Sequence, residues 1–295
     1  METVAFYSYK GGVGRSMLLA NAARYLAGAG KGVVALDFDF EAPGLHYKLT
    51  GGPTTAGGAV PYLLATAYGA SSPPPLDEHM TSVPVASDAG GWIRMMPAGP
   101  APQKSYWVAL KQLGDRLQLD DPSGRGIMAV LDLQARIADE LKPDYLLIDA
   151  RTGVTELGGL AATVLADTVV CLFVGNSESL DGTLAIVEAL KSAPRLANQR
   201  PIRVVPVLSR TTQPLSFNES FQSGLKRLLE LGDSNWSPDP NGRVLLVLPH
   251  DHPYGASEWL VGSEEAKGSM FSQLYKAYMT LFSKLFPETT PASWS

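Results

Sequence analysis

The sequence runs Tyr9-Lys10-Gly11-Gly12-Val13-Gly14-Arg15-Ser16 between a short apolar segment, residues 4–7, and a helix-forming segment, residues 17–26. The apolar segment fits a buried strand, and the second is rich in good helix formers. Glycines at a strand-to-helix turn let backbone N–H groups approach phosphate oxygens, and the helix N-terminus adds a partial positive charge. We therefore predict a phosphate-binding loop here, rather than a glycine-rich turn without a ligand.

Two residues depart from the general phosphate-loop pattern. Arg15 stands where that pattern has lysine, and Tyr9 stands where it has its first glycine. In return, the loop carries a second cation, Lys10, close to its start. This early lysine, followed by the three glycines and a serine, resembles the deviant Walker A motif of the MinD/ParA family of ATPases. The resemblance extends over residues 3–286.

The resemblance implies ATP or ADP as ligand and an ATP-dependent homodimer. The implied nucleotide contacts are Gly11, Gly12, Val13, Gly14, Arg15, Ser16 and Met17. In the family the early lysine reaches across the dimer to the partner's nucleotide, so we expect this role for Lys10. Both Lys10 and Arg15 are expected to act in catalysis. The Ser16 hydroxyl stands where a loop serine holds Mg²⁺.

Two later segments end in carboxylates. Residues 33–39 predict a buried strand with Asp37 and Asp39 at its end, and residues 143–149 predict a strand that ends in Asp149. Ligands of parallel α/β sheets bind outside the carboxyl ends of the strands, so these side chains should face the phosphates. The resemblance implies that Asp39 positions the attacking water, and that Asp39, Asp149 and the loop serine hold Mg²⁺. Solvated aspartates, or an Asp149 that only caps the next turn, are the alternatives.

The segment after Asp149 corresponds to the second switch of the family. Gly153 fits the glycine whose N–H lies near the γ-phosphate, whereas Arg151 departs from the family pattern. A cation there could stabilise transition-state charge as an arginine finger does. It could equally pair with Asp39 or Glu41, and the sequence leaves both roles open.

On the side of the nucleotide base, the resemblance implies contacts from Arg210, Pro249, His250 and Asp251. Ser209 stands where the family has asparagine, which weakens the expected recognition of the base by that side chain. His250 and His252 also raise the question of a zinc site. Their spacing is short and no further Cys or His accompanies them, so we favour a polar loop at the edge of the nucleotide site.

The composition bounds the class of protein. The chain has 295 residues, 45% hydrophobic and 18% charged, which fits a globular protein. Its 24 basic and 29 acidic residues give a net charge of −5, which argues against nucleic acid as a partner. The single cysteine, Cys171, lies in an apolar run, so we expect a buried thiol and no internal disulfide. There is no leader pattern and no apolar run of about eighteen residues, so we expect a cytoplasmic protein without a transmembrane segment.

Strands and helices alternate along the chain, which predicts one α/β domain over residues 1–295. Its sheet should be doubly wound and mostly parallel, with helices on both faces. Residues 51–90 are rich in glycine and proline, which predicts a loop-rich insertion with a short helix near residues 61–68. The last predicted helix, residues 264–286, carries an apolar stripe. The MinD branch uses such a helix to contact membranes, but few cations on the polar face favour packing on the sheet.

The function that follows is an ATPase that works as an ATP-dependent dimeric switch and recruits or positions a protein partner. The sequence does not name that partner. Because arginine binds phosphate as a rigid planar fork, it does not simply replace lysine, and we expect slow or partner-activated hydrolysis. The same substitution supports a second hypothesis, a nucleotide-sensing scaffold that hydrolyses ATP very slowly or not at all. A kinase or ligase would need a second substrate site, and no motif for one occurs.

Overall fold

The computed structural model describes residues 1–55, 57–67, 73–85, 88–117, 125–150, 164–193, 200–211, 218–232, 246–249 and 273–289. The strands are β1 (Glu2–Ser8), β2 (Gly32–Phe38), β3 (Thr81–Val83), β4 (Trp92–Met96), β5 (Tyr145–Ala150), β6 (Thr168–Phe173), β7 (Arg203–Thr211) and β8 (Leu246–Pro249). The α-helices are α1 (Arg15–Gly28), α2 (Leu45–Thr50), α3 (Ala59–Ala67), α4 (Lys104–Leu117), α5 (Arg125–Arg136), α7 (Ser177–Ser192), α8 (Glu219–Leu231) and α10 (Gln273–Leu285). A short 3₁₀ turn covers Leu76–Glu78, and a π-helical turn, Ile137–Leu141, follows α5.

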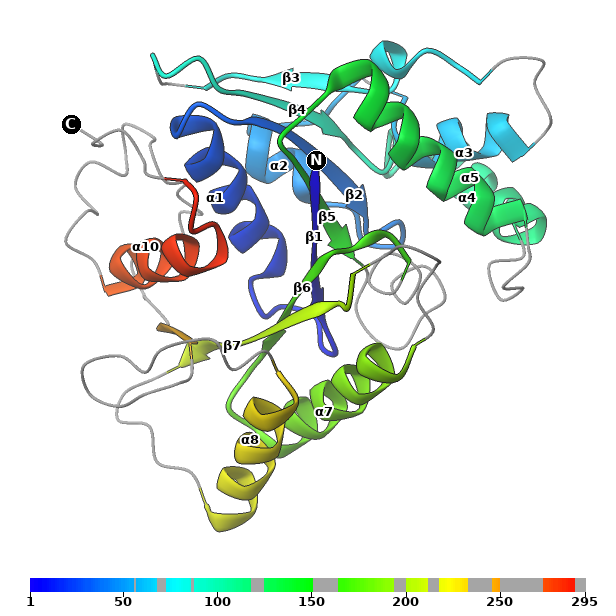
Figure 1. Cartoon of the computed structure of the whole chain (residues 1–295). Coiled ribbons are helices and arrows are strands. Elements are labelled where there is room, and N and C mark those ends of the chain that lie inside the picture. Colours follow the sequence, from blue (N-terminus) through cyan, green and yellow to red (C-terminus); the bar gives the residue numbers. More distant parts are fainter. Residues whose placement is uncertain are drawn as a thin grey trace.

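The strands form one sheet in the order β3-β4-β2-β5-β1-β6-β7-β8, with helices on both faces (Figure 1). Neighbouring strands run parallel except β3, which is antiparallel to β4. Strand β1 lies between β5 and β6, so that Phe6 pairs with Asp149 and Tyr7 with Cys171. The chain moves from β1 to one side of the sheet and later returns to the other side. Open α/β sheets bind ligands at such a point of reversal.

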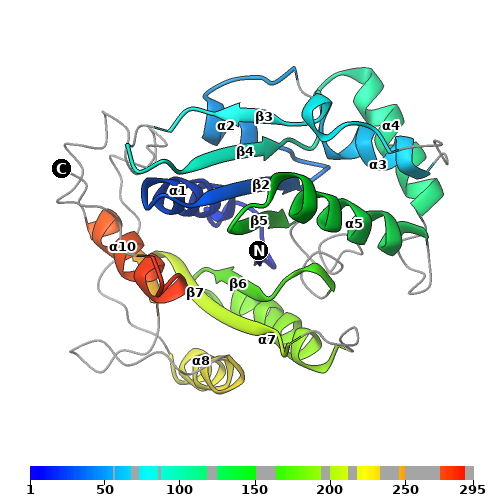
Figure 2. The ribbon, with the colours of Figure 1, turned by 45° about the horizontal axis from the view of Figure 1, so that its top comes forward.

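The core consists of two layers that are separated by the sheet. On one face, Val4 and Phe6 of β1 pack in the cluster that contains residues of α1 and α10. On the other face, Ala5 and Tyr7 belong to the cluster built with α3, α4, α5 and α7 (Figure 2). Strands buried on both faces read as continuous apolar runs, which is why the sequence predicted them readily. The expected doubly wound, mostly parallel sheet is confirmed.

Helix α10 packs on the same face of the sheet as α1. Tyr278 and Phe282 are buried, and the ring of Phe286 lies against Tyr25 and Tyr145. This contact confirms core packing for the described part of the last predicted helix, whereas residues 264–272 lie outside the described residues. Across the described stretches of the chain, no helix is both long and apolar enough to cross a membrane.

The segment of residues 51–90 differs from the loop-rich insertion that its composition predicts. It contains α3, which confirms the short helix, and it also adds β3 to the edge of the sheet. Val60 and Leu63 of α3 are fully buried, so the segment contributes to the core. The sequence missed β3 because it is only three residues long and carries no run of alternating apolar residues.

Candidate functional site

The loop between β1 and α1 has the backbone geometry expected of a phosphate-binding turn. Gly12 and Gly14 have φ angles of 73° and 89°, left-handed values that glycine adopts without steric cost. Helix α1 begins directly after Gly14, and no side chain caps its first turn. A Cβ atom on Gly11 or Gly14 would meet nothing within 4 Å. The loop therefore presents an open backbone surface and the positive end of a helix, the combination that binds phosphate.

Arg15, the first residue of α1, turns its guanidinium towards two of the predicted carboxylates. Its Nε donates to Asp149 Oδ1 at 2.5 Å, and one terminal nitrogen pairs with Asp39 Oδ2 at 2.6 Å. Arg15 is buried, with 6% of its side chain exposed. The other terminal nitrogen, Nη1, is also buried and has no hydrogen-bond partner in the part of the chain that the structure describes. Arg15 thus links the loop to the carboxyl ends of β2 and β5.

Three carboxylates, Asp37, Asp39 and Asp149, lie close together, and two of them, Asp39 and Asp149, pair with Arg15. Asp37 lies opposite Asp149 in the β2–β5 ladder, is fully buried, and accepts N–H bonds from Asp39 (3.1 Å) and Leu45 (3.2 Å). Burial, and then the charge of Asp149, raises the pKa of Asp37 well above its ordinary value. Burial also raises the pKa of Asp149, although the nearby guanidinium opposes this effect. One cation therefore faces more negative charge than it can neutralise when all three groups are ionised.

Lys10 points away from this cluster. Its side chain is 42% exposed and forms an ion pair with Glu178 in the first turn of α7. The Lys10 ammonium lies 6.0 Å from the centroid of the Tyr9 ring. That ring packs against Gly182 of α7 so closely that a Cβ atom on Gly182 would overlap it. Tyr9 and Lys10 together join the start of the loop to α7.

The end of β7 holds the middle of the loop. The Ser209 hydroxyl donates to the carbonyl of Val13 at 2.9 Å. The guanidinium of Arg210, a residue with a left-handed φ of 53°, donates to the carbonyl of Gly12. The family resemblance implies a place near the base for both positions, and here both residues contact the loop. Their hydrogen bonds hold two loop carbonyls from β7, which is separated from β1 by β6.

The structure brings most of the predicted site residues to the edge of the sheet that is formed by the carboxyl ends of its parallel strands. The residues that gather there are Lys10, Gly11, Gly12, Val13, Gly14, Arg15, Ser16, Met17, Asp39, Asp149 and Arg210. Pro249 ends β8 opposite Thr211, at the same edge but beyond β7. The predicted residues Gly153, His250 and Asp251, and the open questions at Arg151 and His252, lie outside the described residues. Sequence reasoning missed Glu178 and Gly182, since no motif connects α7 with the loop.

The donor set for the expected Mg²⁺ has the right chemistry but is already paired with a cation. Magnesium prefers oxygen ligands, which Ser16, Asp39 and Asp149 offer. However, Arg15 already binds one oxygen of each carboxylate. Within the described stretches, no group of three or more His, Cys, Asp or Glu side chains is arranged to hold a metal ion. The buried Asp149 Oδ2 has no hydrogen-bond partner among the described residues, but with Arg15 on both carboxylates the arrangement does not fit a magnesium ion.

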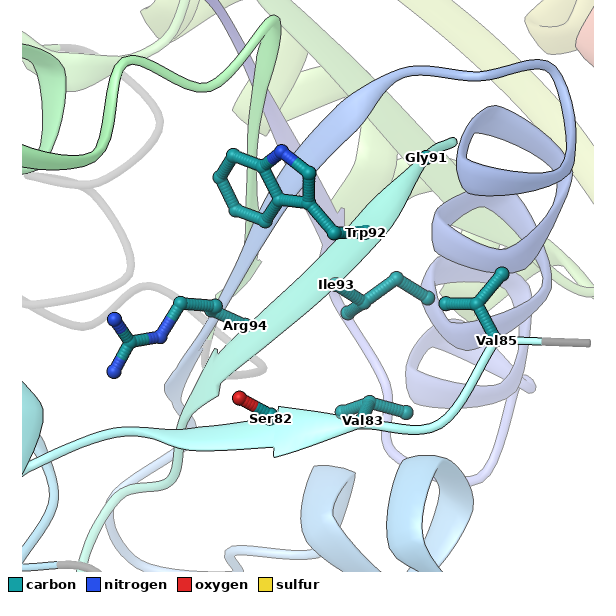
Figure 3. Close-up of a pocket in the computed structure, with 7 residues that line it drawn as sticks. All are labelled: Ser82, Val83, Val85, Gly91, Trp92, Ile93 and Arg94. Carbon is teal, nitrogen blue, oxygen red and sulfur yellow. The ribbon is translucent and has the colours of Figure 1, made fainter. Parts of the chain in front are cut away.

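A separate hollow of about 310 Å³ lies at the β3–β4 edge of the sheet. Figure 3 shows Trp92 and Arg94 on one side of β4 and Ile93 on the other, near Val83 and Val85. Trp92 is the first residue of β4 and pairs with the first residue of β2, so the hollow lies towards the amino ends of these parallel strands. It contains none of the predicted site residues, and it lies at the opposite end of these strands from Asp39 and Arg15.

Comparison with protein families identifies a nucleotide-binding domain. The model of the CobQ/CobB/MinD/ParA nucleotide binding domain matches residues 4–251, which is most of the chain. A search of curated proteins finds no match.

Several solved structures share the fold. The septum site-determining protein MinD of Pyrococcus horikoshii, complexed with Mg-ADP, is 17% identical, with 97% of this chain and 96% of that chain covered and a TM-score of 0.65. The cell division ATPase MinD of Pyrococcus furiosus is 20% identical, with 97% and 99% covered and a TM-score of 0.64. The ATP complex of a McdA variant from Cyanothece is 16% identical, with 97% and 96% covered and a TM-score of 0.61. At these identities the likeness establishes the fold.

Proposed function

Because this chain belongs to the CobQ/CobB/MinD/ParA family of nucleotide-binding domains, we propose that it binds ATP and ADP at the loop of residues 9–16 and hydrolyses ATP. The observation that carries the proposal is the loop itself. Its glycines leave the backbone open, and its helix start has no side-chain cap. The backbone N–H groups and the helix N-terminus would hold the phosphates, since fixed dipoles of this kind bind anions without a rearrangement.

The side chains around the loop have roles in the proposed hydrolysis. Arg15 places a buried positive charge beside the phosphates, and Asp39, which is 14% exposed, lies where it could orient a water molecule. Ser209 and Arg210 hold the loop in shape from β7. Charge that is fixed before the reaction contributes most to stabilising a phosphoryl transition state. Two of the solved structures that share the fold are complexes with Mg-ADP and with ATP, which supports the ligand class.

A dimeric switch is the finer part of the proposal. Lys10 lies beside the loop and its side chain is 42% exposed, so it is accessible to the nucleotide of a second copy once its ion pair with Glu178 opens. ATP would favour the dimer if it binds the dimer more tightly than the monomer, because a ligand shifts a population only through differential binding. The dimer would then present a face for a protein partner. A MinC:MinD complex of Aquifex aeolicus is among the structures that share this fold, which supports a partner of the protein class.

The test of the nucleotide site compares two glycines with similar backbones. Gly14 and Gly51 have φ angles of 89° and 74°, and a Cβ atom on either would meet nothing within 4 Å. The backbone strain of an alanine is therefore similar at the two sites, but only Gly14 borders the proposed phosphate cradle. We expect Gly14→Ala to weaken ADP binding in isothermal calorimetry by about tenfold or more, and Gly51→Ala to leave it unchanged. Equal affinity in both variants would refute a nucleotide site at this loop.

The second candidate function is a scaffold that binds nucleotide but turns it over very slowly or not at all. The observation in its favour is the engagement of Arg15 with Asp39 and Asp149, which draws the loop cation towards carboxylates. Interactions that are equally strong in the ground state and transition state do not accelerate chemistry. Single-turnover ATP hydrolysis by the wild type and by Arg15→Lys separates the candidates. A faster lysine variant with unchanged ATP affinity supports the scaffold, whereas an equal or slower variant supports the ATPase.

A further inference from the structure

Among the described residues, the Arg15 guanidinium uses two of its three nitrogens and leaves the third without a partner. Nε and one terminal nitrogen hold Asp149 and Asp39, at 2.5 and 2.6 Å. The remaining nitrogen, Nη1, is buried and makes no hydrogen bond to any residue that the structure describes. A buried donor without an acceptor costs free energy, so its presence indicates an acceptor that joins the site. Arg15 directly follows the loop glycines, so the missing acceptor would lie beside the phosphate cradle.

A phosphate oxygen fits this donor in both charge and geometry. The guanidinium is planar, and its fork matches phosphate as well as carboxylate. Because two of its nitrogens are bound to carboxylates on β2 and β5, the direction of the third is fixed before any ligand arrives. With a phosphate bound, one cation would bridge Asp39, Asp149 and the nucleotide.

In phosphate-loop ATPases of other kinds, a divalent ion makes this bridge between a strand-end carboxylate and the phosphates. Here one oxygen of each carboxylate already contacts a buried positive charge, and a second cation beside it would be repelled. The described residues also contain no other cluster of acidic, His or Cys side chains that could hold a metal. The guanidinium and the ion thus compete for the same two carboxylates, although the buried Asp149 Oδ2 has no hydrogen-bond partner among the described residues.

We propose that the Arg15 guanidinium takes the place of the divalent cation, so that this protein binds ADP and ATP without needing Mg²⁺. The inference rests on the proposed nucleotide site. It adds that the bound form of the ligand is the nucleotide without a metal ion. Arg15 is then the residue that selects metal-free nucleotide. A lysine at this position would lose the bridge, because its compact ammonium cannot bind two separated carboxylates and a phosphate in a plane.

The test measures ADP affinity by calorimetry in excess EDTA and in excess Mg²⁺. For the wild type we expect dissociation constants that agree within about threefold. For Arg15→Lys we expect binding in EDTA to be weaker than in Mg²⁺ by about tenfold or more. Arg94→Lys is the matched control, since Arg94 also pairs with an aspartate, Asp77 at 2.6 Å, but lines the hollow at the opposite end of β4. It should behave as the wild type does.

A second measurement keeps the inference testable if Arg15→Lys does not fold. Mn²⁺ can stand in for Mg²⁺, and its electron paramagnetic resonance signal reports how much metal is bound. We expect the wild type with ADP to retain no more Mn²⁺ than free ADP does. Tight Mn²⁺ in the wild-type complex, or loss of ADP binding in EDTA, would overturn the inference and leave the nucleotide site standing. Absence of ADP binding under both conditions would instead refute the proposed function and the inference with it.

Discussion

At the scale of single residues, Tyr9 and Gly182 show how one departure from a loop pattern is accommodated. A ring stands where the pattern has glycine, and the helix opposite it has a glycine where the ring lies. Residues far apart in sequence are thus matched in shape, and each restricts what the other can be. The loop depends on α7 for its position, although nothing in the motif suggests it.

We expect Gly182→Ala to destabilise the protein by about 1–3 kcal/mol, because the added methyl group overlaps the Tyr9 ring. Gly114→Ala is the matched control, since Gly114 is also inside a helix but its Cβ would meet nothing within 4 Å. That change should stabilise α4 by about 0.5–1 kcal/mol, as alanine usually does in helices. Urea unfolding of the two variants measures both effects. A stabilised Gly182→Ala protein would show that the contact does not constrain the loop.

Asp37 should make the stability of the fold depend on pH. Burial, and then the charge of Asp149, raises its pKa in the folded protein, so the folded state holds the proton more tightly than the unfolded state does. Its contribution to stability is therefore full below the unfolded pKa and is lost as pH rises through the folded pKa. The slope cannot exceed about 1.4 kcal/mol per pH unit for one proton.

Asp37→Asn cannot ionise, so we expect this variant to lose part of the decline in stability between mildly acidic and mildly alkaline pH. Urea unfolding across that range, compared with the wild type, makes the measurement. Glu140→Gln, which removes an exposed carboxylate on the π-helical turn, should decline as the wild type does. The same decline in the Asp37→Asn protein would mean that Asp37 is ionised in the fold at all these pH values.

The sequence predicts which residues lie at the site better than it predicts the contacts between their side chains. That Asp39 and Asp149 meet the loop follows from strands that end together at one edge of a parallel sheet. That Arg15 binds both carboxylates does not follow, because the direction of a long side chain depends on its neighbours in three dimensions. The partners of Lys10 and Tyr9 lie on α7, about 170 residues along the chain, and only tertiary structure brings them together.

At the scale of elements, the start of α7 binds the side chain of Lys10, which we expect to act between two copies of the protein. Asn176 caps this helix by accepting an N–H bond from Ser179 at 2.8 Å, which fixes the first turn. Glu178 in that turn then pairs with Lys10. The pair is exposed on both sides, so it contributes little to stability, but it must open before Lys10 can reach another molecule.

We expect Glu178→Gln to strengthen ATP-dependent self-association by about twofold to fivefold, because Lys10 then has no ion pair with residue 178 to break before it contacts the second copy. Its melting temperature should not change. Glu188→Gln removes the partner of Arg227 in another exposed pair, between α7 and α8, and serves as the control. Sedimentation velocity over a range of concentrations measures the association. Weaker association of Glu178→Gln would show that Glu178 belongs to the contact itself.

Elements differ in how well composition predicts them. Fully buried strands such as β5 and β6 and the amphipathic helix α8 follow from the sequence pattern, because burial on both faces or on one face imposes it. The edge strand β3 does not, since glycine and proline around it suggest loops and its pairing with β4 is a tertiary event.

For the whole molecule, we expect a dimer with a non-hydrolysable ATP analogue and a monomer without nucleotide. The expectation rests on Lys10, an exposed cation at the edge of the sheet where the loop lies. Lys10→Ala should remain a monomer with the analogue while still binding it, and Lys276→Ala, an exposed lysine on α10, should dimerise as the wild type does. Light scattering coupled to size exclusion measures both. A dimer of Lys10→Ala would remove Lys10 from the interface.

The central place of β1 has a consequence for synthesis on the ribosome. This strand is made first, yet its neighbours in the sheet are β5 and β6, which begin at Tyr145 and Thr168. At about 5–20 residues per second, the nascent chain waits roughly 10–30 s before its first strand finds a neighbour. During that time Val4 and Phe6 have no partner strand to cover them. A ribosome that stalls before Tyr145 would therefore release an aggregation-prone fragment, so we expect chaperones to bind the chain while the residues between β1 and β5 are translated.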